Sequence, residues 1–173
     1  MGKKVIKVTL STRGINNGIK ELDNYKREIV RKTDLLREKV GAMIAELSRS
    51  GFSGAVVEDL VNGEQRTAQV DVTIDARENV TVVIASGEDA VWVEFGAGVY
   101  HNKPAGRSPH RSGMEHGFTI GGYGKGMGRR DVWGFYEDGE LRLTHGTPAT
   151  MPMYNALKTV CEEIAEIARE VFG

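Results

Sequence analysis

The stretch Thr144–Leu157 reads Thr-His-Gly-Thr-Pro-Ala-Thr-Met-Pro-Met-Tyr-Asn-Ala-Leu, and it decides how we expect the C-terminal part of the chain to fold. Gly146 and Pro148 predict a turn, because glycine permits a positive φ and proline fixes φ. Thr150 is a candidate N-cap, and Pro152 suits the first turn of a helix, where its missing N–H costs nothing. The stretch therefore predicts the end of a short strand, a turn and the start of the last helix.

The last helix is predicted to bury one face. Its apolar residues recur at alternating spacings of four and three, which places them on one side of a helix. They are Met153, Leu157, Val160, Ile164, Ile167 and Val171. Cys161 lies beside this face, and we expect it to pack in the core or at its edge, because a nucleophile needs an electropositive, accessible setting.

A longer helix is predicted near the N-terminus, from Gly18 to about Arg49, after a turn at Thr12–Asn17. At 1.5 Å per residue it would be about 48 Å long, whereas a compact chain of this length is roughly 40 Å across. The helix must therefore overhang its own domain, bend around its own sheet, or break, and Gly41 is the best candidate for a break. An overhanging apolar stripe would need a neighbouring subunit to cover it.

The strands predicted between the two helices are short and antiparallel. Asp138-Gly139 is a strong type I′ hairpin signal between two of them. Val80–Ala85 is continuously apolar, which indicates a central strand. The predicted strands are Ala68–Asp75, Val80–Ala85, Val132–Glu137 and Glu140–Thr144, with Ala55–Val61 a short apolar segment and Ala90–Phe95 a short helix or strand. A further short strand is predicted before the long helix, at Val5–Leu10.

These elements predict the α+β class in a single domain spanning residues 1–173. We expect an antiparallel β-sheet with the long N-terminal helix (about residues 18–49) and the C-terminal helix packed on one face. The β-rich middle would cover residues 55–95, a long basic, Gly-rich loop residues 96–130, and the hairpin with the last helix residues 131–173. The loop is far longer than an ordinary connection, and such loops are usually functional or disordered.

Composition is that of an ordinary globular protein, with 40% hydrophobic and 27% charged residues. No apolar run approaches the roughly 20 residues that a membrane helix needs, and no apolar stretch follows Lys3 and Lys4 as in a secretory signal. We therefore expect no membrane partner. With one cysteine the chain has no internal disulfide, which suits a reducing cytoplasm.

The charges are segregated along the chain although the net charge is only −1. Residues 1–50 carry +6, residues 51–96 carry −7, residues 97–130 carry +5 and residues 131–173 carry −5. One interpretation is that four solvated faces cancel in three dimensions. The other is that faces of opposite sign meet between copies of the chain, where they would set register and association rate.

The basic loop and the apolar segment before it supply the candidate interface residues. Basic side chains interleaved with aromatic ones suit a protein partner, a nucleic acid, or a mobile loop that orders only on assembly. The candidates are Trp92, Phe95, Tyr100, Lys103, Arg107, Arg111, Phe118, Tyr123, Lys125, Arg129 and Arg130.

Motifs for catalysis or cofactor binding are not supported. Gly124-Lys125 is followed by Gly126, whereas a phosphate-binding loop needs Ser or Thr at that place. The four histidines, His101, His110, His116 and His145, lack the spacing of a zinc site and are expected to be exposed. The carboxylates are dispersed, so no acid–base pair stands out. We expect a protein that is not an enzyme and that has no cofactor and no metal.

Two short segments resemble one protein family. Gly-Thr-Pro-Ala at residues 146–149, followed by Pro-Met-Tyr-Asn-Ala-Leu at 152–157, is similar to the C-terminal signature of the head–tail joining proteins of tailed phages, also called neck or tail-completion proteins or minor tail components. Val91–Gly98 resembles the acidic, aromatic and Gly-containing segment upstream in that family. This chain departs from the family at Met151-Pro152, where Pro-Phe is usual.

The resemblance implies a structural virion protein of the head–tail junction that acts in tail attachment or tail termination. It also implies a ring of identical subunits, with a hexamer as the candidate order, next to head-completion or connector proteins and tail proteins, and close to DNA in the channel. The chain would be found in the virion, after assembly in the host cytoplasm. The alternative function is nucleic-acid binding through the basic Gly-rich loop.

Overall fold

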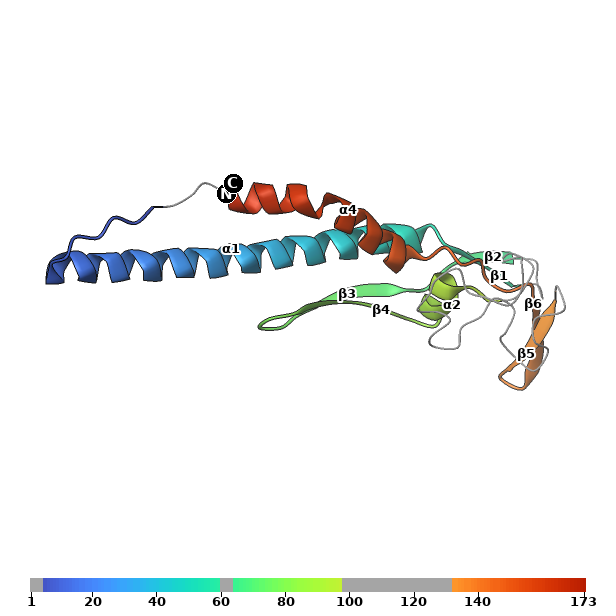
Figure 1. The fold of residues 1–173 in the computed structure, drawn as a ribbon. Helices are drawn as coiled ribbons and strands as arrows, with labels where there is room; N and C mark the ends of the chain where they lie inside the picture. The colour runs from blue at the N-terminus through green and yellow to red at the C-terminus, as the bar shows by residue number, and fades with distance from the viewer. Residues whose placement is uncertain (1–4, 60–63, 98–131) are drawn as a thin grey trace.

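The computed structural model describes residues 5–59, 64–97 and 132–173, and these residues form an elongated molecule built on one long helix (Figure 1). The helices are α1 Thr12–Ser53, α2 Ala90–Phe95 and α4 Pro152–Phe172. The strands are β1 Val56–Asp59, β2 Glu64–Thr67, β3 Asp71–Ala76, β4 Thr81–Ser86, β5 Trp133–Glu137 and β6 Glu140–Thr144. The predicted α+β class is confirmed. The basic Gly-rich loop predicted at 96–130 lies almost entirely outside the described residues.

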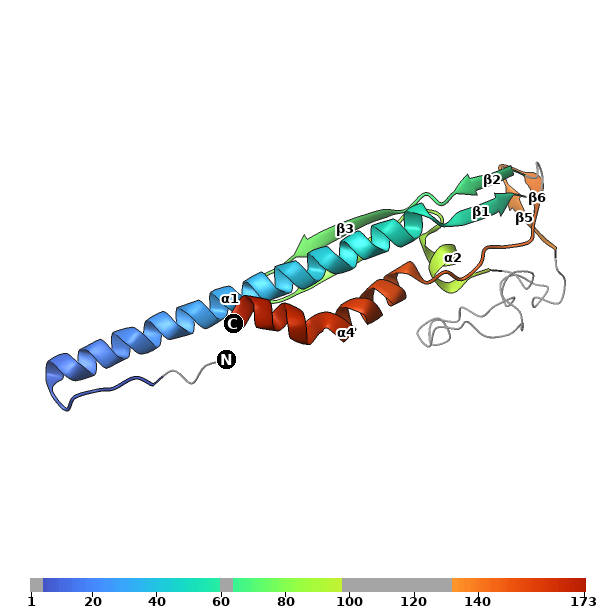
Figure 2. The ribbon, with the colours of Figure 1, turned by 90° about the horizontal axis from the view of Figure 1, so that it is seen from above.

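Helix α1 lies between two other layers. Helix α4 runs antiparallel to it on one side, and the β3–β4 hairpin lies along the other, as the two perpendicular views show (Figures 1 and 2). Both long helices are thus on the same side of the hairpin, but α4 rests on α1 and not directly on strands. Arg49 fastens the hairpin to the helix, because its Nε and Nη2 atoms donate to the Val72 carbonyl at 3.0 and 2.7 Å.

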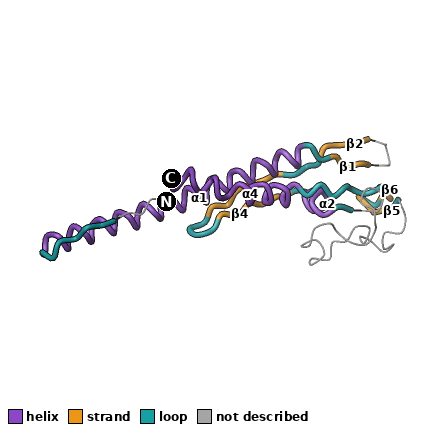
Figure 3. Tube along the Cα trace, turned by 45° about the horizontal axis from the view of Figure 1, so that its top comes forward, coloured by secondary structure: helices purple, strands orange, loops and turns teal. Residues whose placement is uncertain are grey.

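The strands form three separate two-stranded antiparallel sheets, β1–β2, β3–β4 and β5–β6, and not the single sheet that we expected. The β3–β4 hairpin lies along α1, whereas β1–β2 and β5–β6 lie beyond the C-terminal end of that helix (Figures 2 and 3). The hairpins therefore do not line up edge to edge. The prediction of Val80–Ala85 as a central strand is wrong, since β4 pairs only with β3 among the described residues.

Helix α1 is longer than predicted. It has 42 residues and begins after Ser11, whose Oγ accepts a hydrogen bond from the Gly14 N–H at 3.1 Å. The predicted turn at Thr12–Asn17 is wrong, because the glycine there, Gly14, lies in the helix and serves close approach. A Cβ on Gly14 would lie 2.0 Å from Thr9 Oγ1, since the chain before the helix folds back along it. The strand predicted at Val5–Leu10 is an extended segment without strand pairing in the described structure.

Gly41 does not break the helix. It is buried at the point where β4 crosses, and a Cβ there would lie 2.6 Å from Thr81 Cγ2. Gly51 plays the corresponding part on the other side, where a Cβ would lie 2.8 Å from the Cβ of Pro152 in α4. The two glycines therefore let the hairpin and α4 approach the same helix closely.

The predicted hairpin at Asp138-Gly139 is confirmed, with φ of 51° and 82° at the two turn residues, as a type I′ turn requires.

The main core lies where the C-terminal end of α1 meets β3–β4, α2 and the start of α4. Its buried members are Ala45, Phe52, Ala55, Val72 and Val93, with Val57, Ala68, Val70, Val83, Ala85 and Met153 packed against them. Within the described residues, no helix is both long and apolar enough to span a membrane.

Candidate partner-binding groove

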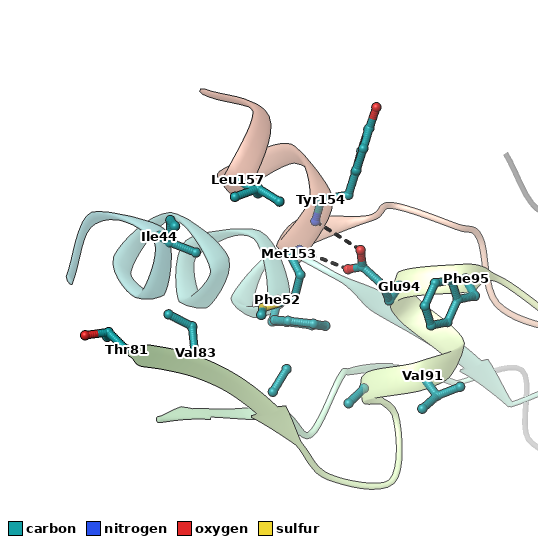
Figure 4. Close-up of a pocket in the computed structure, with 12 residues that line it drawn as sticks. Ile44, Phe52, Thr81, Val83, Val91, Glu94, Phe95, Met153, Tyr154 and Leu157 are labelled. Atoms are coloured by element: carbon teal, nitrogen blue, oxygen red, sulfur yellow. Dashed lines mark hydrogen bonds between the residues drawn. The ribbon is translucent and has the colours of Figure 1, made fainter. Parts of the chain in front are cut away.

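An apolar groove of about 500 Å³ opens between α1, β4, α2 and the first turns of α4 (Figure 4). Phe52 of α1 and Met153 of α4 form its floor, next to the main core. Leu157 forms part of its rim and stays 49% exposed. Its lining residues are Ile44, Phe52, Thr81, Val83, Ala85, Ala90, Val91, Glu94, Phe95, Met153, Tyr154 and Leu157. The groove is apolar, and its rim is open to solvent.

Glu94 fixes one wall of the groove. Its side chain is buried, and its two carboxylate oxygens accept hydrogen bonds from the backbone N–H groups of Met153 and Tyr154 at 2.9 and 3.0 Å (Figure 4). These N–H groups belong to the first turn of α4 and have no partner within the helix. A carboxylate at a helix N-terminus is also favoured by the helix dipole. Glu94 on α2 therefore caps a helix that begins far downstream in the sequence.

Thr150 does not cap α4, contrary to prediction. The residue before the helix is Met151, which has a φ of 51° and makes no side-chain capping bond. The Thr150 backbone N–H instead donates to the carbonyl of Val93 at 3.0 Å. The left-handed turn at Met151 aims the first N–H groups of α4 at Glu94, so the capping group comes from α2.

Residues 91–97 are in contact with residues 146–157, the two stretches in which the sequence suggested a family resemblance. Besides the Glu94 cap, an antiparallel bridge joins Ala97 and Thr147, with N–H to O distances of 2.9 and 3.0 Å. Gly146, with a φ of 92°, makes the predicted turn just before it. The two segments thus form one unit, which the sequence alone did not require.

A buried carboxylate also holds α2 in place from its other end. Asp89 is only 4% exposed and accepts from Arg66 Nη1 at 2.5 Å, from Arg66 Nη2 at 2.9 Å, and from the Gln69 N–H at 2.8 Å. Burial by itself would raise the pKa of Asp89, but the hydrogen bonds and the guanidinium charge outweigh it and hold the pKa below its usual value. The pair links β2 to the start of α2, and so supports the groove.

Two of the predicted interface residues belong to the described structure, and both lie on α2. Phe95 lines the groove, and Trp92 is half-buried on the same helix. The other nine, from Tyr100 to Arg130, lie outside the described residues, as do three of the four histidines. The nucleic-acid alternative rests on those same residues and stays a prediction.

The sequence reasoning missed Glu94, Arg66 and Asp89. A signal for Glu94 was present, because an acidic residue inside the apolar run Val91–Phe95 must find hydrogen-bond donors when that run is buried. That signal did not show that the donors are the backbone N–H groups of Met153 and Tyr154. No group of His, Cys, Asp and Glu side chains suited to a metal ion occurs in residues 5–59, 64–97 and 132–173.

Helix α4 leaves part of its apolar face uncovered. Ala156, Val160 and Ile167 are buried, but Leu157 and Ile164 remain exposed. The predicted single buried face is therefore split: one edge packs on α1, and the other faces solvent. Cys161 lies in the exposed edge, and the prediction that it packs in the core or at its edge is wrong.

The N-terminal half of α1 has a second uncovered stripe. Leu22 is 56% exposed, and Ile15 and Ile19 are exposed beside it. This part of the helix projects beyond α4 and the hairpin, which end farther along (Figures 2 and 3). We call Thr12–Arg31 the arm.

Comparison of the chain with models of protein families, with curated proteins and with solved structures finds no match.

Proposed function

We propose that this chain is a structural virion protein of the head–tail junction of a tailed phage, where copies of it form a ring. The observation that carries the proposal is the contact between the two segments with the family resemblance. Glu94 of the first caps the helix that carries Met153 and Tyr154 of the second. A likeness in two segments that build one unit has more weight than a likeness in two unrelated places.

The uncovered apolar surfaces support an assembling protein. A monomeric protein rarely leaves contiguous apolar stripes and an open apolar groove in water. Here the arm and the outer edge of α4 both do so. A closed ring joins one face of each subunit to a different face of the next, and the chain offers two such faces. A hexamer is the candidate ring order, with head-completion or connector proteins and tail proteins as neighbours.

The test is deletion of the gene for this chain from the phage genome that encodes it. We expect filled heads and separate tails that fail to join, as seen by electron microscopy, and normal particles when the intact gene is supplied in trans. Mass spectrometry of purified virions should detect the chain in a small, fixed copy number. Infectious tailed particles that contain no copy of it would overturn the proposal.

A further inference from the structure

The stripe on the arm continues an interface that already exists inside the molecule. Ile15, Ile19 and Leu22 follow three–four spacing and lie on the same face of α1 as Ile44. At Ile44 that face meets α4, because Ile44 and Leu157 both line the groove between the two helices. The same face therefore carries apolar residues toward both ends of α1, interrupted by Lys26 and Thr33, but only the C-terminal group meets α4.

Helix α4 ends where the arm begins. The carbonyl of Phe172 accepts from Lys32 Nζ at 3.4 Å, and Glu170 forms an ion pair with Lys39. Upstream of Lys32, the described segment 5–10 packs at Gly14 and Gly18, beside the apolar stripe and not over it, since Leu22 remains 56% exposed. The arm thus continues for about 30 Å beyond its intramolecular partner.

The outer edge of α4 is the complementary surface. Leu157, Cys161 and Ile164 are exposed and follow three–four spacing, so they form a short stripe that runs into the open groove. Val91 of α2 is exposed at the groove's other rim. A helix laid along this edge would bury its apolar face against α4 and α2 together.

Charge favours an arm in this groove over two arms paired with each other. Residues 5–31 carry six basic and three acidic side chains. Residues 71–95, which build the β3–β4 hairpin and α2, carry six acidic side chains and one basic one, and α4 carries four acidic and two basic. Arm against arm would bring like net charges together, whereas arm against body brings opposite ones together.

We propose that the arm of one copy docks its stripe into the groove and along α4 of a second copy. The contact joins two different surfaces, so it leaves one free arm and one free groove on every pair and can continue around a ring. It deepens the proposed function by assigning the surfaces through which copies join, and it rests on that function only for its setting in a virion.

Two single variants in the full-length chain test the pairing. Leu22→Glu places a carboxylate on the arm's stripe, and Leu157→Glu places one at the groove. Both positions are exposed, so folding should be retained, which circular dichroism checks. Each variant should self-associate at least about tenfold more weakly than the parent in light scattering, because an unpaired charge would be buried in an apolar contact. Asn17→Glu, on the opposite side of the arm, is the matched control.

Mixing the two variants is the decisive step. Leu22→Glu keeps an intact groove and Leu157→Glu keeps an intact arm, so an equimolar mixture should form one-to-one dimers and nothing larger. If arms instead paired with arms, Leu157→Glu alone would assemble like the parent and the mixture would gain no new contact. That result, or a parent chain that stays monomeric at every concentration tested, would overturn the proposal.

Cys161 provides a second readout that does not depend on loss of assembly. Position 22 and Cys161 are about 30 Å apart within one molecule by helix rise, because they lie on opposite sides of the Lys32–Phe172 contact. A disulfide between them must therefore join two copies. Leu22→Cys should form such a disulfide under mild oxidation, whereas Asn17→Cys should not. Equal yields from both would contradict the docking.

These experiments use purified protein, so their outcome is separate from that of the virion test. Docking without a place in virions would leave the inference standing and remove the proposed function. Presence in virions without arm-to-groove docking would leave the proposed function standing and remove the inference.

Discussion

The two halves of helix α1 carry similar apolar patterns but have opposite surroundings. In the C-terminal half, Ala45, Ser48 and Phe52 are buried between α4 and the β3–β4 hairpin. In the N-terminal half, Ile15 and Leu22 remain exposed. The comparison teaches that three–four spacing specifies which face of a helix prefers burial, but does not say what buries it. The variants below test how far the two halves differ.

The largest contrast is expected from truncating one apolar side chain in each half. Phe52→Ala should lower the free energy of unfolding by about 3–5 kcal/mol, because it opens a cavity in the core below the groove. Leu22→Ala should change it by less than about 0.5 kcal/mol in the monomer, as is usual for an exposed position. Urea unfolding at low protein concentration measures both. Similar losses at the two positions would mean that the arm is packed in the monomer.

Glycine substitution should act with opposite sign in the two halves. Gly51→Ala forces a Cβ to within 2.8 Å of Pro152 Cβ at the crossing with α4, so we expect a loss of about 1–3 kcal/mol. Gly18→Ala meets only the side chain of Val8 in an extended segment, which can shift. The higher helix propensity of alanine should then stabilise the arm by up to about 1 kcal/mol. Thermal unfolding of both variants gives the signs, and a loss at Gly18 would contradict this account.

Removing the cap of α4 should have a smaller effect, confined to the packed end. Glu94→Ala leaves the N–H groups of Met153 and Tyr154 without their acceptors, at a cost of about 1 kcal/mol. Glu94→Gln should cost less, because one amide oxygen can still accept. Amide hydrogen exchange should rise at Met153 and Tyr154 and stay unchanged in the arm. Unaltered exchange at both amides would mean that Glu94 does not cap the helix.

The smallest predicted effect is a change in acid stability on the packed side. The pKa of Asp89 is lower in the folded protein than its ordinary value of 3.8, so its contribution to stability is present above about pH 4 and is lost as pH falls through the folded pKa. Asp89→Asn should therefore flatten the loss of stability as the pH falls below about 4. Asp23→Asn, on the exposed arm, is the control and should leave the acid limb unchanged.

Local sequence signals predicted a helix or hairpin well where the residues that carry the signal constrain the backbone of adjacent residues. Asp138-Gly139 fixed a hairpin, and Pro152 with the apolar spacing after it fixed α4. The start of α1 was mispredicted because Gly14 looks like a turn residue, yet it lies inside the helix and allows the close approach of a segment that folds back. Nothing local to a glycine distinguishes these two reasons for its presence.

The candidate site was less accessible to sequence reasoning. Phe95 was identified as an interface residue, but the groove it lines is formed by four elements, and its walls are set by Glu94 and by the Asp89–Arg66 pair. Each of these contacts spans more than twenty positions in the sequence. The exposed edge of α4 was also missed, because periodicity marks an apolar face without showing that α1 is too narrow to cover all of it.

The short bridge between Ala97 and Thr147 has a practical consequence. Its two hydrogen bonds hold the two ends of the chain between these residues next to each other, beside α2 and the turn that precedes α4. Closing a longer excursion costs little, since each doubling of loop length adds only about 0.6 kcal/mol. The exposed turn at Asp138-Gly139, which lies between Ala97 and Thr147, is therefore a natural place to graft a tag, a fluorophore or a foreign peptide, as long as these two residues keep their pairing.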